Sequence, residues 1–132
     1  MYEPNRFVAI DGDQVGKKLE EAVLRNDILA VIHLSESIRD CFILLGRKLE
    51  GFGMVVHINA GDMVLAQGMI TSKDLLSLEL GKGPIALSCG LGKTLRLAHL
   101  ALRVAKAHGG NRIVEAIGDL GGDLEFQDIR LG

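Results

Sequence analysis

Three aspartates lie where carboxylates often do chemistry, at the ends of predicted strands. Asp11 and Asp13 directly follow the apolar run at residues 7–10, and Asp62 lies at the tip of a predicted hairpin. In a sheet that places the first strand beside that hairpin, the three carboxylates would converge. Carboxylate oxygens, completed by water and phosphate, are the ligands that Mg²⁺ prefers. The three residues therefore indicate a site for Mg²⁺, or for Mn²⁺ in its place, that supports phosphoryl transfer.

The residues between and after the first two aspartates suit a bound phosphate. Gly12 lets the backbone approach a ligand closely. Gln14, Val15 and Gly16 open the next predicted helix, where outward-pointing amides and the helix dipole favour anions. A simpler interpretation remains open, in which Asp-Gly-Asp is a turn followed by a helix cap.

Hydrophobic periodicity predicts the elements that must position these groups. We expect strands at residues 7–10, 54–58, 63–66 and 85–88, with a possible further strand at 113–114. Helices are expected at 14–24, from Asp27 to about 49, from Thr71 or Ser72 to about Leu80, and at 95–107. This order predicts an α/β fold with a mixed sheet, formed by residues 1–132 as one domain. The Gly- and Asp-rich tail after residue 118 remains unassigned.

Composition excludes several functions. The net charge of −2 provides no basic field for holding nucleic acid, and few aromatic side chains are present to stack on bases. No apolar run approaches the roughly 20 residues that cross a bilayer. The polar N-terminus is unlike a signal peptide. Cys41 and Cys89 are typical of buried thiols in a reducing cytosol. We therefore expect a soluble cytoplasmic protein that binds neither nucleic acid nor membrane.

Three motifs together resemble a known family. They are residues 7–20 (FVAIDGDQVGKKLE), 59–64 (NAGDMV), and 90–98 with 101–112 (GLGKTLRLA and ALRVAKAHGGNR). In this order and spacing, the chain resembles the minimal CRISPR polymerases. That family is related to the Palm domain of type III CRISPR effectors and to GGDEF diguanylate cyclases.

The resemblance implies a ferredoxin-like Palm with a central, mostly antiparallel sheet. It also implies a nucleotidyltransferase that makes a cyclic di- or oligonucleotide from nucleoside triphosphates, such as ATP, in antiviral defence. The product would act on a separate effector, and ring closure between two nucleotides favours a homodimer. By this similarity Asp11 and Asp62 bind the metals and Gly12 adds its carbonyl. Asp13 is either an additional ligand or a carboxylate that supports the ligands without touching the metal, and Lys106 contacts the triphosphate.

The chain departs from the related cyclases at two motif positions. Met63 replaces the second acid of the hairpin motif, and a thioether neither binds Mg²⁺ well nor accepts a proton. Gly110 stands where many diguanylate cyclases have an arginine, and Arg112 is the nearest replacement. These changes leave open a second hypothesis, a catalytically degenerate nucleotide-binding domain, and a third, a structural protein without a ligand.

Two further strings imitate functional motifs. Gly92-Lys93-Thr94 resembles the end of a P-loop, but Leu87 stands where that motif requires a glycine. Residues 121–126 (GGDLEF) imitate the GGDEF string without a preceding apolar strand. We interpret them as a chance match or as a loop before a final strand.

Overall fold

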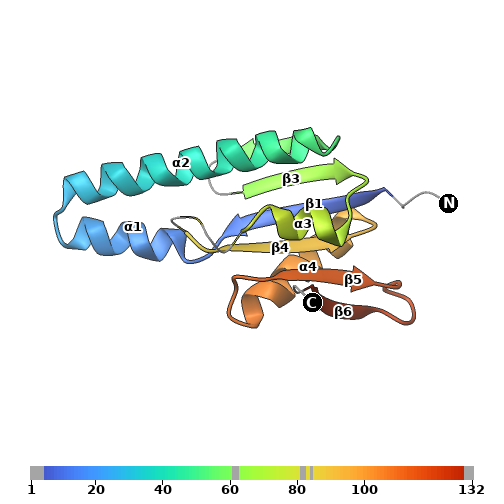
Figure 1. Ribbon diagram of the computed structural model, residues 1–132. Helices are drawn as coiled ribbons and strands as arrows, with labels where there is room; N and C mark the ends of the chain where they lie inside the picture. The colour runs from blue at the N-terminus through green and yellow to red at the C-terminus, as the bar shows by residue number, and fades with distance from the viewer. Residues whose placement is uncertain (1–4, 61–62, 81–82, 84, 130–132) are drawn as a thin grey trace.

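The computed structural model describes residues 5–60, 63–80, 83 and 85–129, and contains six strands and four helices within these ranges (Figure 1). In chain order these are β1 (Arg6–Gly12), α1 (Val15–Leu24), α2 (Ile28–Gly51), β2 (Val55–Ala60), β3 (Met63–Gly68), α3 (Ser72–Ser77), β4 (Leu87–Gly92), α4 (Leu95–Ala107), β5 (Ile113–Ile117) and β6 (Glu125–Ile129).

The strands form one sheet in the order β2-β3-β1-β4-β5-β6. The β4–β5 pair is parallel and the other four pairs are antiparallel. This confirms the predicted α+β fold and its mostly antiparallel sheet. The β2–β3 hairpin lies beside β1, as the convergence of the aspartates required. Asp11 stands opposite Met63 on β3 and opposite Ser88 on β4.

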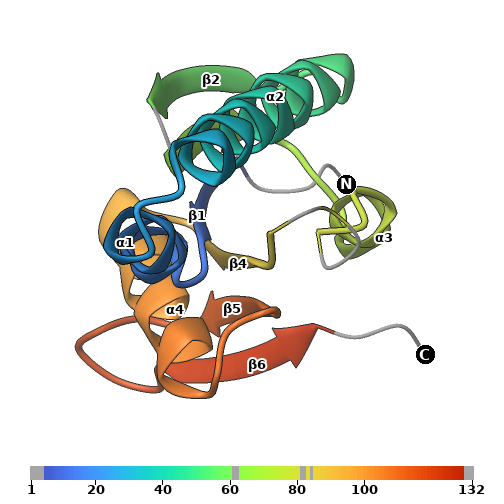
Figure 2. The same ribbon diagram turned by 90° about the vertical axis from the view of Figure 1, so that its left-hand side faces the viewer.

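The alternating side chains of β1 enter two separate cores. Val8 and Ile10 pack in the cluster that contains Phe42 of α2, whereas Ala9 packs with Leu102 of α4. The helices α2 and α4 therefore cover opposite faces of the sheet (Figure 2). This alternation is what a strand buried on both faces requires. The end of β1, where Asp11 and Gly12 lie, is therefore between the layer of α2 and the layer of α4.

Close packing of α4 on β4 explains one error in the sequence prediction. We expected this strand at residues 85–88. Instead, β4 runs over Leu87–Gly92. A Cβ atom at Gly90 would collide with the Ala98 carbonyl oxygen and the Leu102 amide of α4. Glycine in this strand thus permits direct backbone contact with a helix.

Helix boundaries largely follow the predicted caps. Asp27 Oδ1 accepts a hydrogen bond of 3.0 Å from the Ala30 amide at the start of α2. Thr71 and Asp74 form a reciprocal capping box on α3. That helix ends at Ser77, earlier than the predicted Leu80, and the backbone at Glu79 has a positive φ of 54°.

The tail contains a strand that the sequence reading left unassigned. Turn residues 121–123 precede β6, which pairs antiparallel with β5. The GGDLEF string is thus the connection into a final strand, one of the two interpretations above. None of the described helices is long and apolar enough to span a membrane.

Candidate active site at the end of strand β1

A tight turn connects β1 to α1 and positions the predicted phosphate-binding residues. The Asp13 amide donates a hydrogen bond of 2.9 Å to the Ala86 carbonyl, which fixes the turn against the segment before β4. Gln14 has a positive φ of 56°, and α1 begins immediately after it at Val15. A Cβ at Gly12 would lie 2.5 Å from Val15 Cγ2, so the turn requires glycine there. The helix therefore begins at Val15, one residue later than predicted, because Gln14 has left-handed backbone geometry.

The first turn of α1 is open to an anion. Gln14 makes no side-chain hydrogen bond to the helix amides, and the first turn contains no acidic residue. Gly16 has nothing within 4 Å of the position of a Cβ. Uncapped amides at a helix N-terminus are a favourable environment for phosphate oxygens.

Lys106, in the last turn of α4, places its ammonium among the oxygens of the β1–α1 turn. Its Nζ lies 3.0 Å from the Gly12 carbonyl oxygen, 3.5 Å from Asp11 Oδ2 and 3.4 Å from Asp13 Oδ1. Three consecutive residues thus direct oxygens at one cation. The structure brings together four residues that the sequence analysis selected from two distant motifs.

Asp13 joins three segments through its carboxylate. Oδ1 accepts a hydrogen bond of 2.6 Å from Ser88 Oγ, and Oδ2 accepts one of 2.7 Å from the Asn111 amide. Ser88 is fully buried on β4. At Gly110, where φ is 74°, a Cβ would lie 2.7 Å from the Asp13 carboxyl group. Asp13 therefore holds the β1–α1 turn, β4 and the α4–β5 loop in fixed relation.

A pocket lined by four polar side chains, an alanine and two glycines lies at this junction. It has a volume of about 480 Å³ and is lined by Asp13, Gln14, Ala86, Lys106, Gly109, Gly110 and Asn111. Gln14 and Lys106, both predicted to hold phosphates, thus face one space. Arg112 does not line this pocket. Its guanidinium binds the Gly110 carbonyl at 3.1 Å and Asp128 Oδ2 of β6 at 3.2 Å.

The oxygens around Lys106 are chemically suited to a divalent ion. Asp11, Gly12 and Asp13 supply two carboxylates and a backbone carbonyl, and the turn already holds one positive charge. Mg²⁺ typically uses few protein oxygens and completes its shell with water and phosphate. Within the described ranges, no group of three or more His, Cys, Asp or Glu side chains could hold a metal. Asp62 lies outside those ranges, so its predicted pairing with Asp11 stays a prediction.

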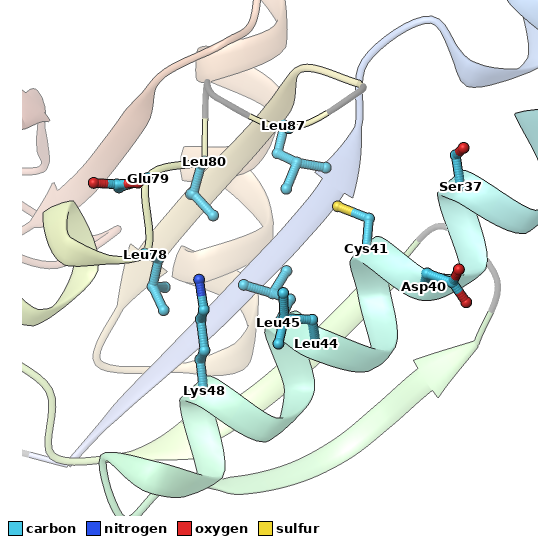
Figure 3. A pocket seen from close by; sticks show the side chains of 11 residues that line it. Ser37, Asp40, Cys41, Leu44, Leu45, Lys48, Leu78, Glu79, Leu80 and Leu87 are labelled. Carbon is cyan, nitrogen blue, oxygen red and sulfur yellow. The ribbon is translucent and has the colours of Figure 1, made fainter.

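A second pocket lies on the face of the sheet that α2 covers, between α2 and residues 78–80, 83 and 87 (Figure 3). Its volume is about 430 Å³, and Leu87, which stands opposite Gly12 in the β1–β4 register, contributes to its wall. Cys41 and Lys48 extend from α2 into this space (Figure 3). Burial raises the pKa of the Cys41 thiol, and the charge of Lys48 lowers it in part. Among the described residues, its lining comprises Ser37, Asp40, Cys41, Leu44, Leu45, Lys48, Leu78, Glu79, Leu80, Gly83 and Leu87.

The sequence profile of the minimal CRISPR polymerase domain matches residues 7–116, which include the β1–α1 turn, the hairpin and α4. This chain belongs to the minimal CRISPR polymerase family. The match covers most of the chain and confirms the resemblance drawn from the three motifs. A search of curated protein sequences gave no match.

Solved structures share the fold of this minimal CRISPR polymerase domain at low sequence identity. The GGDEF domain of DgcB from Caulobacter crescentus, in complex with c-di-GMP, superposes with a TM-score of 0.64 and 16% identity. The alignment covers 84% of this chain and 77% of that domain. The guanylyl cyclase Cya2 gives a TM-score of 0.59 and 11% identity over 96% of this chain and 91% of its own. At such identities the likeness establishes a cyclase-type Palm fold.

Sequence reasoning missed two residues of the candidate site in this minimal CRISPR polymerase domain, Ser88 and Asn111. Ser88 offered one signal, because it is a hydroxyl within the otherwise apolar residues 85–91. Asn111 contributes a backbone amide, and any residue type supplies that group. Its contact with Asp13 could be found only from the folded chain.

Proposed function

We propose that this minimal CRISPR polymerase domain is a metal-dependent nucleotidyltransferase that converts nucleoside triphosphates into a cyclic di- or oligonucleotide. The observation that carries this proposal is the convergence at the β1–α1 turn. The oxygens of Asp11, Gly12 and Asp13 meet Lys106 there, beside the uncapped start of α1 and the adjoining pocket. This is the combination that a triphosphate and its counter-cation require.

The triphosphate would bind over the β1–α1 turn. The amides of Val15 and Gly16 offer hydrogen bonds to phosphate oxygens, and Lys106 offers positive charge from the other side of the pocket. Asp13 is already held by Ser88 and Asn111, so it fixes the turn during this binding. Preorganised donors of this kind need no rearrangement when charge develops on the phosphates.

The base would occupy the second pocket, between α2 and residues 78–80, 83 and 87. Leucine side chains supply apolar contact for the faces of the base, and Ser37 and Asp40, which also line the pocket, are able to form polar contacts. Leu87 links this pocket to Gly12 across the β1–β4 pair. A nucleotide bridging the end of β1 would thus contact both faces of the sheet.

Asp11 and the Gly12 carbonyl, with Asp62 as a further ligand, would hold Mg²⁺ or Mn²⁺. When bound, such an ion lowers the pKa of an attacking ribose hydroxyl and polarises the α-phosphate. Lys106 would neutralise negative charge on the phosphates as pyrophosphate leaves. In this scheme the protein chiefly orients the nucleotide and stabilises charge.

A homodimer would bring a second nucleotide to the reaction. Joining two nucleotides into a ring requires each hydroxyl to face the α-phosphate of the other, which a two-fold arrangement satisfies. The structural neighbours, a GGDEF domain bound to c-di-GMP and a guanylyl cyclase, support cyclic nucleotide chemistry at the level of the fold. We further propose that the product controls a separate effector in antiviral defence, as family membership suggests.

Incubation of the purified protein with each triphosphate, in Mg²⁺ or Mn²⁺, tests the proposal. We expect pyrophosphate release that is lost in Asp11→Ala and Asp62→Ala. Asp119→Ala is the matched control, because Asp119 pairs with Lys93 and lies outside the turn and its pocket. Mass analysis of the product would identify the base and the ring size. Absence of pyrophosphate release with every triphosphate and both metals would contradict an enzymatic role.

Met63 favours a second candidate function, a nucleotide-binding domain without turnover. It stands opposite Asp11 in the β1–β3 pair, where related cyclases follow their hairpin aspartate with an acid. A thioether there removes one oxygen from the expected donor set. Under this alternative, the protein binds a triphosphate with metal and releases no pyrophosphate.

A further inference from the structure

We propose that Lys106 is a resident counter-ion of the metal site, which a bound triphosphate draws away, so that the metal and the nucleotide bind cooperatively. This inference rests on the proposed function, because it assigns the regulation of the same site. The inference is drawn from the position of the Lys106 ammonium group. Lys106 Nζ contacts oxygens of three consecutive residues, with the Gly12 carbonyl the nearest at 3.0 Å.

The ammonium and a divalent ion would compete for the same oxygens. The side chains of Lys106, Asp11 and Asp13 are 35%, 32% and 13% exposed, so solvent screens their charges only in part. A second cation bound to Asp11 and the Gly12 carbonyl would lie within a few ångströms of Nζ. Like charges at that separation repel strongly in a partly buried site. Lys106 therefore weakens the binding of a metal that arrives alone.

The Lys106 ammonium can also turn toward a ligand in the adjoining pocket, which its side chain lines. Gln14, Gly109, Gly110 and Asn111 also line that pocket, where the phosphates are proposed to bind. A lysine ammonium on its flexible four-carbon stem can turn toward such a partner. A triphosphate in the pocket would draw the ammonium from the Asp11 and Gly12 oxygens and leave them to the metal.

The turn would keep its shape when Lys106 leaves. Asp13 retains its hydrogen bonds to Ser88 Oγ at 2.6 Å and to the Asn111 amide at 2.7 Å, both shorter than its 3.4 Å contact with Lys106. Replacement of the Lys106 ammonium by a metal ion thus moves one side chain and leaves the backbone of the turn in place. By thermodynamic linkage, the triphosphate raises metal affinity by the same factor by which the metal raises triphosphate affinity.

The test measures Mn²⁺ binding to the nucleotide-free protein, by the loss of the electron paramagnetic resonance signal of free Mn²⁺. We expect Lys106→Met to bind Mn²⁺ about tenfold more tightly than the unaltered chain, because a nearby positive charge is removed. Lys93→Met is the matched control. It removes a lysine that pairs with Asp119 beside the other end of α4, and its Mn²⁺ affinity should equal that of the unaltered chain.

Two further variants test whether a gain in Mn²⁺ affinity depends on the Asp11 carboxylate. Lys106→Gln keeps a polar side chain, should the methionine disturb folding, and should also bind Mn²⁺ more tightly. The double variant Asp11→Asn with Lys106→Met should lose the gain. Equal or weaker Mn²⁺ binding by both folded Lys106 variants would overturn the proposal, as would a gain that persists without the Asp11 carboxylate.

The reciprocal effect is measured with a non-hydrolysable triphosphate analogue. Mn²⁺ should increase its affinity more in the unaltered chain than in Lys106→Met, where no ammonium has to be exchanged. This readout requires no turnover. A protein that releases no pyrophosphate yet shows the Mn²⁺ gain would contradict the enzymatic proposal alone. Turnover without that gain would overturn the counter-ion role alone.

Discussion

Ser88 Oγ donates a hydrogen bond of 2.6 Å to Asp13 Oδ1, from a fully buried position on β4 to the turn that follows β1. The two residues are 75 positions apart in the sequence. Their contact holds the carboxylate in the orientation that also meets the Asn111 amide and Lys106. A short hydroxyl–carboxylate hydrogen bond in a buried setting is among the stronger neutral–charged contacts in proteins.

Replacing Ser88 with alanine should destabilise the fold and loosen the turn. The change removes a hydrogen bond to a charged group, which typically contributes about 1.5–3 kcal/mol. Urea denaturation would measure the loss. Ser77→Ala is the control, since the Ser77 hydroxyl bonds an exposed carbonyl on α3, and a change there should stay within about 0.5 kcal/mol. Equal effects of the two substitutions would contradict the importance of the buried contact.

Gly110→Ala should disturb both stability and triphosphate binding. The residue has a φ of 74°, and a Cβ would lie 2.7 Å from the Asp13 carboxyl group. A non-glycine residue in this backbone region costs about 1–3 kcal/mol, and displacement of Asp13 adds to it. Thermal unfolding and binding of a triphosphate analogue are the measurements. Gly51→Ala, with open space around its Cβ position and no positive φ, should leave both unchanged.

The two cysteines should react with iodoacetamide at very different rates. Burial raises the pKa of Cys41 above its ordinary value and that of Cys89 to about 12. A raised pKa means less thiolate at a given pH, and the thiolate is the reacting species. Between pH 8 and 9.5 we expect Cys41 to react more slowly than a peptide cysteine, with a rate that rises with pH. Cys89 should react only on unfolding, and mass spectrometry would locate each adduct.

A bound nucleotide should protect Cys41 from alkylation. The thiol faces the pocket that is proposed for the base (Figure 3). In a Cys89→Ala variant, which leaves Cys41 as the single thiol, a triphosphate analogue with Mn²⁺ should slow the reaction severalfold. Inorganic tripolyphosphate carries no base and should give no protection. An analogue that raises the unfolding temperature while leaving the alkylation rate unchanged would place the base elsewhere.

Local signals in the sequence predicted a large part of the fold. Asp27 and Thr71 mark the starts of α2 and α3, because capping depends on residues only three positions apart. The strand at residues 85–88 was misplaced, because packing of α4 against Gly90 decides its extent. The final strand β6 was predicted only as one of two alternatives for the tail, since most of its side chains are exposed and show no clear apolar alternation.

Sequence motifs indicated some residues of the candidate site. The contacts that depend on the tertiary fold could not be predicted from the sequence. Gln14 and Lys106, selected from two separate motifs, line one pocket. Arg112 was proposed for phosphate, but in this structure its guanidinium pairs with Asp128 on β6. Its predicted role stays a prediction, as do those of Asp11 and Asp62.

The distance between Lys106 and the acidic turn is set by a residue that has no side chain. Lys106 follows Leu102 by four positions, which is about one turn along the helix, and the Leu102 backbone rests against Gly90. Any larger residue at Gly90 would lift the helix and carry the ammonium away from its oxygens. The position of the Lys106 ammonium beside the turn therefore depends on Gly90, a residue of the neighbouring strand β4 that lies outside the turn and its pocket.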